Sequence, residues 1–454
     1  MEQFFKIKSR GSSLSREIAG GITTFLAMAY ILAVNPNILS GKGIDLPFGT
    51  LPAWGAVFTA TALSAVIATL FMAFAANLPV ALAPGLGLNA FFTYTVVLGM
   101  GCSWRLALTA VLVEGVLFII LSICGVRQAI VRSIPDNLKK AVAVGIGLFI
   151  TIIGLVNAGI CSTDTGTIIG FVNFDLAHSS AIVAALGLII TIILYIAKVP
   201  GAVLIGIAIT TIIGIPFKVT SIPESFSIFR LPDAPSLFAF DFKAMLFSSV
   251  TGRFSFAVLG QFFVIFFTFF FTDMFDTIGT LLGVAEQGNL KDKNGEVKNM
   301  KGALLADAVG TVAGACLGTS TVTSFVESSS GVAAGARTGF ASVVTAILFF
   351  LSLFFSDVFF LIPSAATAPA LIFVGFLMIQ SVTKIRFSDP TEGIPAFITI
   401  MAMPFAYSIS KGIMWGMISY VICKCAGKKA REIPVVTWIL AIVFVADIFF
   451  EAMK

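Results

Sequence analysis

Charged residues are scarce in this 454-residue chain, because Asp, Glu, Lys and Arg make up only 11% of it while hydrophobic residues make up 58%. A soluble domain carries about 25% charged residues. The composition therefore excludes a protein whose surface mainly faces water. The polar stretches between the apolar runs are also short, which leaves no room for a separate catalytic domain.

Histidine and paired cysteines are equally scarce. His178, in a predicted loop, is the single histidine, which excludes a histidine-based metal site, a relay of several histidines and a Ser/His/Asp catalytic set. The six cysteines are scattered, and only Cys423 and Cys425 form a C-x-C pair, without the second pair that a zinc site usually uses. We expect no metal and no cofactor, and we interpret the thiols as packing residues.

Long apolar runs are what the chain has in abundance, and crossing a hydrocarbon core takes roughly 20 residues of helix. The pattern predicts an all-α integral membrane protein that carries a small polar solute. We expect about 14 transmembrane segments, at residues 17–38, 52–77, 88–100, 104–125, 138–160, 179–197, 200–216, 256–285, 302–318, 326–340, 340–356, 363–382, 393–407 and 410–425.

Both ends of the chain bear on this topology. The basic N-terminus leads into an apolar run that continues to Asn35 and Pro36 without a small-residue cleavage site, which argues against a cleavable signal. Near the other end, the apolar segment 435–450 contains Asp447, and Glu451 follows it. These acids favour a helix lying in the membrane interface, and an additional span is the alternative.

The positive charges support the predicted topology. With the N-terminus inside, 20 lysines and arginines fall in cytoplasmic loops and seven fall outside, as the positive-inside rule expects. The sequence thus predicts a multi-pass protein of a bacterial-type cytoplasmic (inner) membrane with a cytoplasmic N-terminus. The net charge of +5 follows from this topology, so no nucleic-acid partner is expected.

Two predicted spans, the third and the tenth, are interrupted. Residues 78–92 hold two prolines and two glycines that do not suit a continuous helix, and residues 318–331 are rich in Thr, Ser and Val, which favour extended backbone. In each case we expect a short strand followed by a half-helix, with Asn89 and Glu327 at comparable places. Interrupted segments at corresponding positions of two halves indicate an inverted repeat with a site near the bilayer midplane.

Ionisable groups inside spans are costly, by about 2.5–3.5 kcal/mol on the translocon scale. The candidates are Glu114, Asp273, Asp276, Asp307 and Glu327. A structural role is the favoured interpretation for Glu114 and Asp273 and an open alternative for Asp307. Asp276 and Glu327 are better candidates for binding because of the broken-helix context of their segments.

The chemistry of these groups indicates which class of solute could bind. Asp276 and Glu327 offer carboxylates, and Asn89 offers an amide donor and acceptor. Together they suit a planar heterocycle that carries both N–H donors and carbonyl or ring-nitrogen acceptors. A carboxylic acid in a low-dielectric site also holds its proton more readily, which suits proton coupling.

Four motifs resemble those of a known family. They are TTFLAMAYILAVNP (23–36), APGLGLNAFFTY (83–94), FTDMFDTIGTL (271–281) and LLADAVGTVAGACLGTSTVTSFVESSSGVAAGARTG (304–339). The chain resembles, over nearly its whole length, the AzgA-like purine permeases, the hypoxanthine/guanine/adenine branch of the nucleobase–cation symporter-2 family.

The resemblance implies the uracil-permease fold, with fourteen spans in a seven-plus-seven inverted repeat. It implies a core domain in two parts (1–125 with spans 1–4, 254–356 with spans 8–11) and a gate domain in two parts (126–217 with spans 5–7, 357–430 with spans 12–14). An extracytoplasmic linker (218–253) and a C-terminal apolar helix (431–454) complete the chain. Family members are often dimers through the gate domain, so a homodimer is an expectation.

The resemblance also implies site residues. Asp276-Thr277-Ile278-Gly279 fills the place of the Glu-His-x-Gly pattern of the uracil and xanthine branch, and Val326-Glu327 fills the place of its Gly-Glu pair. The expected substrate-binding residues are Asn89, Ala90, Asp276, Thr277, Val326 and Glu327. Asp276, Asp307 and Glu327 are the expected proton-coupling residues, with Asp273 and Thr24 in secondary or structural roles.

The implied function is import of purine nucleobases (hypoxanthine or guanine, with adenine also considered) by proton symport with alternating access. An anion or other small-solute transporter or channel of related fold is the alternative. The paired acids count against an anion site, which would use helix N-termini without carboxylates. The sequence leaves open which purine is preferred, which acid carries the proton, and whether the coupling ion is a proton or sodium.

Overall fold

The computed structural model describes residues 2–42, 47, 49–124, 135–162, 170–223, 226–247, 253–291 and 297–452. Three of the predicted cytoplasmic charges, Arg127, Arg132 and Lys293, lie outside these residues. Nine helical stretches in the described part are long and apolar enough to cross a membrane, and two shorter apolar helices, Leu86–Gly99 and Ala202–Ile213, accompany them. The helical membrane fold is confirmed, and the number of 14 spans stays a prediction.

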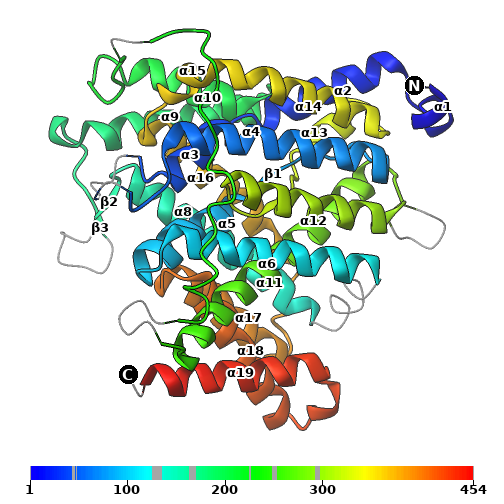
Figure 1. The fold of residues 1–454 in the computed structure, drawn as a ribbon, viewed down its shortest axis with the longest axis vertical. Helices are drawn as coiled ribbons and strands as arrows, with labels where there is room; N and C mark the ends of the chain where they lie inside the picture. Colours follow the sequence, from blue (N-terminus) through cyan, green and yellow to red (C-terminus); the bar gives the residue numbers. More distant parts are fainter. Residues whose placement is uncertain are drawn as a thin grey trace.

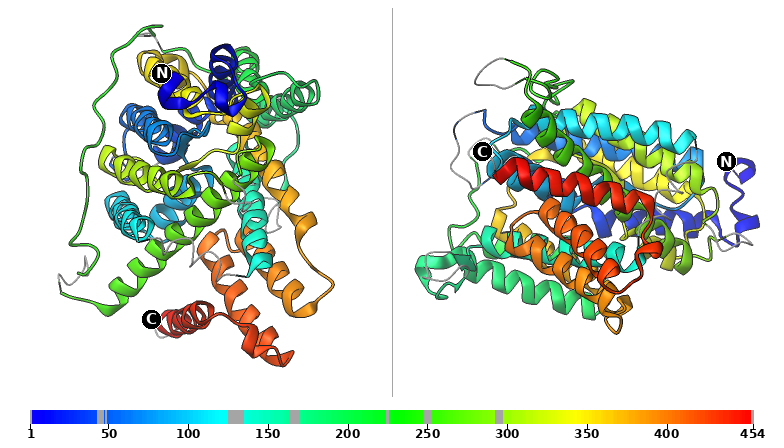
Figure 2. Two further views of the ribbon diagram at one scale, coloured as in Figure 1. Left: turned by 90° about the vertical axis from the view of Figure 1, so that its right-hand side faces the viewer. Right: turned by 90° about the horizontal axis from the view of Figure 1, so that it is seen from below.

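The long helices lie side by side and fall into two packed groups (Figures 1 and 2). In the first group, α4 and α12 pack on each other, α12 packs on α6, and α14 packs on α2 and α4. The bounds in this group are α2 (Leu14–Met28), α3 (Ile31–Leu39), α4 (Trp54–Phe71), α6 (Trp104–Ile123), α11 (Phe256–Gln287), α12 (Met300–Leu317) and α14 (Gly339–Ser352).

In the second group, α8 packs on α16 and α17, α17 packs on α18, and α9 packs on α10 and α16. The bounds are α8 (Asp136–Asn157), α9 (Ser179–Ile196), α10 (Ala202–Ile213), α16 (Ser364–Ile379), α17 (Pro390–Phe405) and α18 (Ile409–Ala426). The smaller elements are α1 (Glu2–Phe5), β2 (Cys161–Ser162), β3 (Gly170–Phe171) and α15 (Ser356–Phe360).

Two short antiparallel strands cross at the heart of the first group. They are β1 (Leu82–Pro84) and β4 (Val322–Ser324), paired Leu82 to Ser324, Ala83 to Thr323 and Pro84 to Val322. Each strand leads into a short helix, α5 (Leu86–Ala90) after β1 and α13 (Ser328–Ala333) after β4. The predicted pair of half-helices preceded by strands is confirmed.

Each strand is held by a threonine of the spanning helix that precedes it. Thr69 of α4 exchanges two hydrogen bonds with the backbone of Leu82, and Thr311 of α12 donates to the carbonyl of Val322 at 3.0 Å. Extended backbone inside a membrane protein is tolerated only where its polar groups are satisfied within the protein. The two threonines meet that requirement in equivalent ways in the two repeats.

The structure refines one predicted span and corrects another. The first, 17–38, lies within a single apolar stretch, Leu14–Leu39, that is long enough to cross a membrane, and a turn at Ala29 and Tyr30 separates α2 from α3 within it. The tenth, 326–340, contains only the six-residue α13, because Gly335 adopts a left-handed φ of 108° and Thr338 caps the new helix α14.

The C-terminal helix α19 (Val435–Ala452) runs parallel to α4, α6 and α12 in two views at right angles (Figures 1 and 2). The Phe444 ring is buried and lies edge-on to Phe267 of α11, with centroids 5.5 Å apart. The helix thus shares the direction of α4, α6 and α12, and its place at the membrane interface or across the membrane stays a prediction.

Candidate functional site

Glu327 stands immediately before α13, in the turn that follows β4. Its side chain is half-buried, and its neighbour Val326 is 45% exposed, so solvent-accessible space adjoins this turn. The Tyr30 hydroxyl donates a hydrogen bond to Glu327 Oε1 at 2.5 Å. The carboxylate also bonds to its own backbone N–H, and among the described residues Tyr30 is the side chain that hydrogen-bonds to it, so acceptor capacity remains for a ligand.

Asp276 lies on α11, beside α13 and β4. Asp276 is half-buried, and its carboxyl group lies within electrostatic range of both Glu327 and Asp307. One turn of helix later, a Cβ added at Gly279 would meet nothing within 4 Å, so there is open space beside this face of α11. The structure thus brings Asp276 and Glu327 together at an accessible place, although they are 51 positions apart in the sequence.

Thr277, next to Asp276, points away from this space and is fully buried. Its hydroxyl is bonded to Asp307 of α12, lies 2.8 Å from the Thr323 hydroxyl of β4, and is 3.4 Å from Asp273 Oδ1. Asp273 and Asp307 are fully buried as well. These four side chains form a polar hub that joins α11, α12 and β4 directly behind Asp276.

Asn89 and Ala90 occupy a different environment, on α5 after β1. Both are buried, with exposures of 0% and 1%. The Asn89 amide nitrogen donates to the carbonyl of Pro84 at 3.4 Å, and the Ser320 hydroxyl donates to its amide oxygen. Both ends of the amide therefore have protein partners, and a substrate would have to displace one of them.

The loop before β4 is tied down by polar side chains from several helices. Asn35 of α3 donates to Thr319 at 2.9 Å, and Thr321 donates to Glu114 of α6 at 2.8 Å. With the Asn89–Ser320 bond, three successive residues of this loop are held from three different helices. Glu114 thus stabilises the loop that leads into β4.

Thr24 lies behind α13. A Cβ added at Gly331 of α13 would collide with Thr24 Oγ1 and with the carbonyl oxygen of Gly20. The two helices therefore touch backbone to backbone, as small residues allow. The structure places Thr24 in this packing contact, away from the accessible carboxylates.

Tyr30 is the residue near the site that our sequence analysis missed. Its position in the TTFLAMAYILAVNP motif drew attention only to a continuous span. A buried tyrosine needs a partner for its hydroxyl, so a tyrosine in an apolar run is a usable signal for an acidic partner elsewhere. The sequence contains only five tyrosines, which makes such a search short.

The two helix groups also meet at the end of the molecule that carries β2 and β3, far from the N-terminus (Figure 1). Asn157 of α8 donates to the Tyr94 hydroxyl at 2.7 Å, and Tyr94 belongs to the wide π-helical turn η3 (Phe91–Gly99) that continues α5. The Tyr407 ring lies edge-on to Tyr94 and to Phe149 of α8. These contacts close the boundary between the groups at this end.

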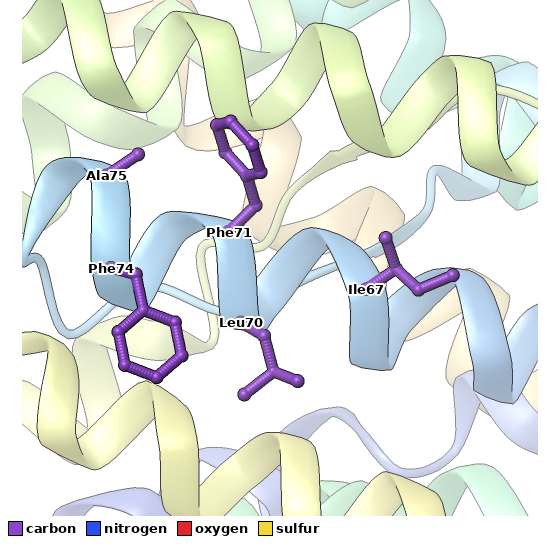
Figure 3. Close-up of a pocket in the computed structure, with 5 residues that line it drawn as sticks. All are labelled: Ile67, Leu70, Phe71, Phe74 and Ala75. Carbon is purple, nitrogen blue, oxygen red and sulfur yellow. The ribbon is translucent and has the colours of Figure 1, made fainter.

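An apolar pocket on α4 and on the π-helical turn η2 (Met72–Ala76) that continues it is not the site. Figure 3 shows Ile67, Leu70, Phe71 and Phe74 lining it along one helix, with Ala75 at its end. None of these side chains has a polar group that could hydrogen-bond to a polar solute, so the pocket suits a hydrocarbon chain. Across the described ranges, His, Cys, Asp and Glu side chains do not gather in threes that could hold a metal ion.

In this architecture, the paired strands and half-helices of an inverted repeat converge on accessible acids within a membrane helix bundle. The transmembrane domain of the cyanobacterial bicarbonate transporter BicA has the same fold, with a TM-score of 0.62, 16% identity, and coverage of 88% of this chain and 97% of that one. The murine anion transporter Slc26a9 in its inward-facing state also matches, with a TM-score of 0.60 and 12% identity over 91% of this chain and 69% of that one.

The chain belongs to the Permease family (Xan_ur_permease), whose model matches residues 15–415. It is 46% identical to a putative permease of Methanocaldococcus jannaschii (98% and 97% of the two chains), and 42% identical to the guanine/hypoxanthine permease PbuG of Bacillus subtilis (99% and 100%). It is 36% identical to the adenine permease AdeP of Escherichia coli (99% and 96%). The resemblance drawn from the motifs is confirmed, and the chain is a membrane transporter.

Proposed function

We propose that this permease imports purine nucleobases across the cytoplasmic membrane, together with protons. The observation that carries the proposal is the convergence of Asp276 and Glu327, from α11 and from the start of α13, on accessible space. A purine presents N–H donors on both of its rings, and two carboxylates on different elements are suitable acceptors for them. The relatives named as guanine/hypoxanthine and adenine permeases support this substrate class.

The polar hub behind Asp276 suits the proton step. A proton on Asp276 or Asp307 would be sensed by substrate on one side and by Thr277 and Thr323 of the strand crossing on the other. Coupling requires that substrate and proton each change the affinity for the other. We propose Asp276, Asp307 and Glu327 as the coupling residues, and a proton rather than sodium as the coupling ion.

Alternating access would come from motion of one helix group against the other. We propose that the first group is the core domain and the second the gate domain, with the N-terminus in the cytoplasm. The Tyr94–Asn157 bond and the Tyr407 contacts would then close the outer side. The exposed Val326 and the open space at Gly279 would face inward. A homodimer through the gate domain stays a prediction.

The alternative, an anion transporter, has the fold in its favour, because BicA shares it. The residues of the site argue against anion transport. Glu327 stands at the N-terminus of α13, where an anion would otherwise be stabilised by free backbone N–H groups, and Asp276 adds a second acid beside it. Two carboxylates at this place would repel a bicarbonate or sulfate ion.

The test is uptake into proteoliposomes of labelled hypoxanthine, guanine, adenine, uracil, bicarbonate and sulfate, with an inward proton gradient and with or without a protonophore. We expect purine uptake that the protonophore abolishes, and its loss in Asp276→Asn. Asp136→Asn, at a side chain that is 82% exposed on the first turn of α8, is the matched control and should transport normally. Sulfate or bicarbonate uptake without purine uptake would overturn the proposal.

A further inference from the structure

We propose that Tyr30 is a positioning residue that holds the Glu327 carboxylate in place for the substrate. The inference rests on the proposed function, because it assigns a partner to one of the proposed substrate-binding acids. It starts from a single contact between segments 297 positions apart: the Tyr30 hydroxyl and Glu327 Oε1 at 2.5 Å. A separation of 2.5–2.7 Å is typical of a hydroxyl that donates to an ionised carboxylate.

Tyr30 lies at the turn between α2 and α3 within the first span. Met28 is the last residue of α2 and Ile31 the first of α3, and the amides of Ala33 and Val34 both bond to the carbonyl of Tyr30. The Tyr30 side chain is 1% exposed. A phenol ring buried to this degree is rigid, so its hydroxyl is a fixed donor.

The contact is not needed to hold the helices together. The Ser12 hydroxyl donates to the carbonyl of Gly335, directly after α13, at 2.9 Å. Glu17 of α2 accepts hydrogen bonds from the amides of Arg337 and Thr338. With these contacts in place, loss of the Tyr30 hydroxyl should be felt mainly at the carboxylate that it touches.

Fixing Oε1 has a consequence for binding. A glutamate at a solvent-accessible turn would otherwise sample several rotamers, and ordering it on binding would weaken affinity. With Oε1 held by Tyr30, the carboxylate is oriented before the substrate arrives, and acceptor capacity remains for an N–H group of the base. Tyr30 thus acts through Glu327 and contributes to affinity without contacting the substrate.

The experiment compares Tyr30→Phe, Glu327→Gln and the double variant in proteoliposomes, with the purine that the wild type carries best. Tyr30→Phe keeps the ring and removes only the hydroxyl. We expect its KM to rise about tenfold, since a preorganised side chain and a charge-assisted hydrogen bond are lost. The Vmax per molecule and the amount of folded protein should stay near wild type. Tyr195→Phe, on a ring of α9 that is 44% exposed, is the matched control and should leave KM unchanged.

The double variant separates positioning from packing. If Tyr30 acts through Glu327, Tyr30→Phe should add no further rise in KM, or in the dissociation constant of the purified protein, to that of Glu327→Gln. An equal further rise, an unchanged KM in Tyr30→Phe, or loss of folded protein with normal KM would each overturn the inference.

A second readout needs no substrate. The infrared difference between wild type and Tyr30→Phe should contain a shifted carboxyl-stretch band that is absent from the same comparison made in Glu327→Gln. Absence of that band in the first comparison would overturn the inference. If the wild type carries no purine, the proposed function fails, and the infrared result still decides whether Tyr30 holds the Glu327 carboxylate.

Discussion

The two strand and half-helix units of the repeat have the same backbone plan and opposite environments. In the first unit, β1 with α5, Asn89 is fully buried and both ends of its amide are bonded to protein. In the second, β4 with α13, Glu327 is half-buried with one oxygen held by Tyr30, and Val326 is 45% exposed. The comparison suggests that the two units have different roles. The first unit stabilises the place where β1 and β4 cross, and the second provides the carboxylate that binds the substrate.

The largest effect that tests this division is expected at Glu327. In Glu327→Ala the substrate loses a charged acceptor, and hydrogen bonds to charged groups contribute about 1.5–3 kcal/mol. We expect Vmax/KM for the purine to fall about ten- to hundredfold with little change in the melting temperature of the detergent-purified protein. Wild-type affinity in this variant would mean that the second unit does not provide the substrate-binding carboxylate.

A smaller but still large effect is expected at Gly331, where α13 touches α2. A methyl group in Gly331→Ala would have to displace Thr24 or the backbone at Gly20, and such overpacking costs about 1–3 kcal/mol. It should move α13 and thereby Glu327, so uptake and melting temperature should both fall. Gly260→Ala on α11, where an added Cβ meets nothing within 4 Å, is the control. Normal uptake by Gly331→Ala would show that the position of α13 is not critical.

The smallest effect on transport is expected in the first unit. Asn89→Ala leaves the Ser320 hydroxyl without its partner and should lower stability by about 1–3 kcal/mol. The KM of the protein that remains folded should change by about twofold or less, since Asn89 is not accessible. Thermal melting and KM should be measured on the same preparation. A large rise in KM without loss of stability would show that Asn89 contacts the substrate and would erase the contrast between the two units.

Much of the fold was predictable from local patterns. Apolar runs predict spanning helices wherever they are long, and Pro84, Gly85 and the Thr- and Ser-rich stretch after Gly318 predict interrupted helices. The turn at Ala29 and Tyr30 within the first span was not predictable in this way, because its residues are as apolar as their neighbours. The orientation of α19 was likewise undecided, since it depends on packing such as that of Phe444 on Phe267.

The candidate site likewise has features that the sequence predicts and features that it does not. Acids inside apolar segments are conspicuous in a sequence, so Asp273, Asp276, Asp307 and Glu327 were all identified as candidates. The cost of an acid in an apolar segment does not predict what surrounds that acid in the folded protein. Asp273 and Asp307 are buried with Thr277, whereas Asp276 and Glu327 are accessible.

The sequence by itself determined that the chain is a helical membrane transporter with two interrupted spans and a few costly acids, because hydrophobicity and backbone propensity act over short stretches of chain. The tertiary structure alone decided which strand pairs with which, and that Tyr30 meets Glu327. It also decided that Asn89 faces protein while Glu327 faces open space. These outcomes depend on hydrogen bonds between residues as many as 297 positions apart, which no local pattern records.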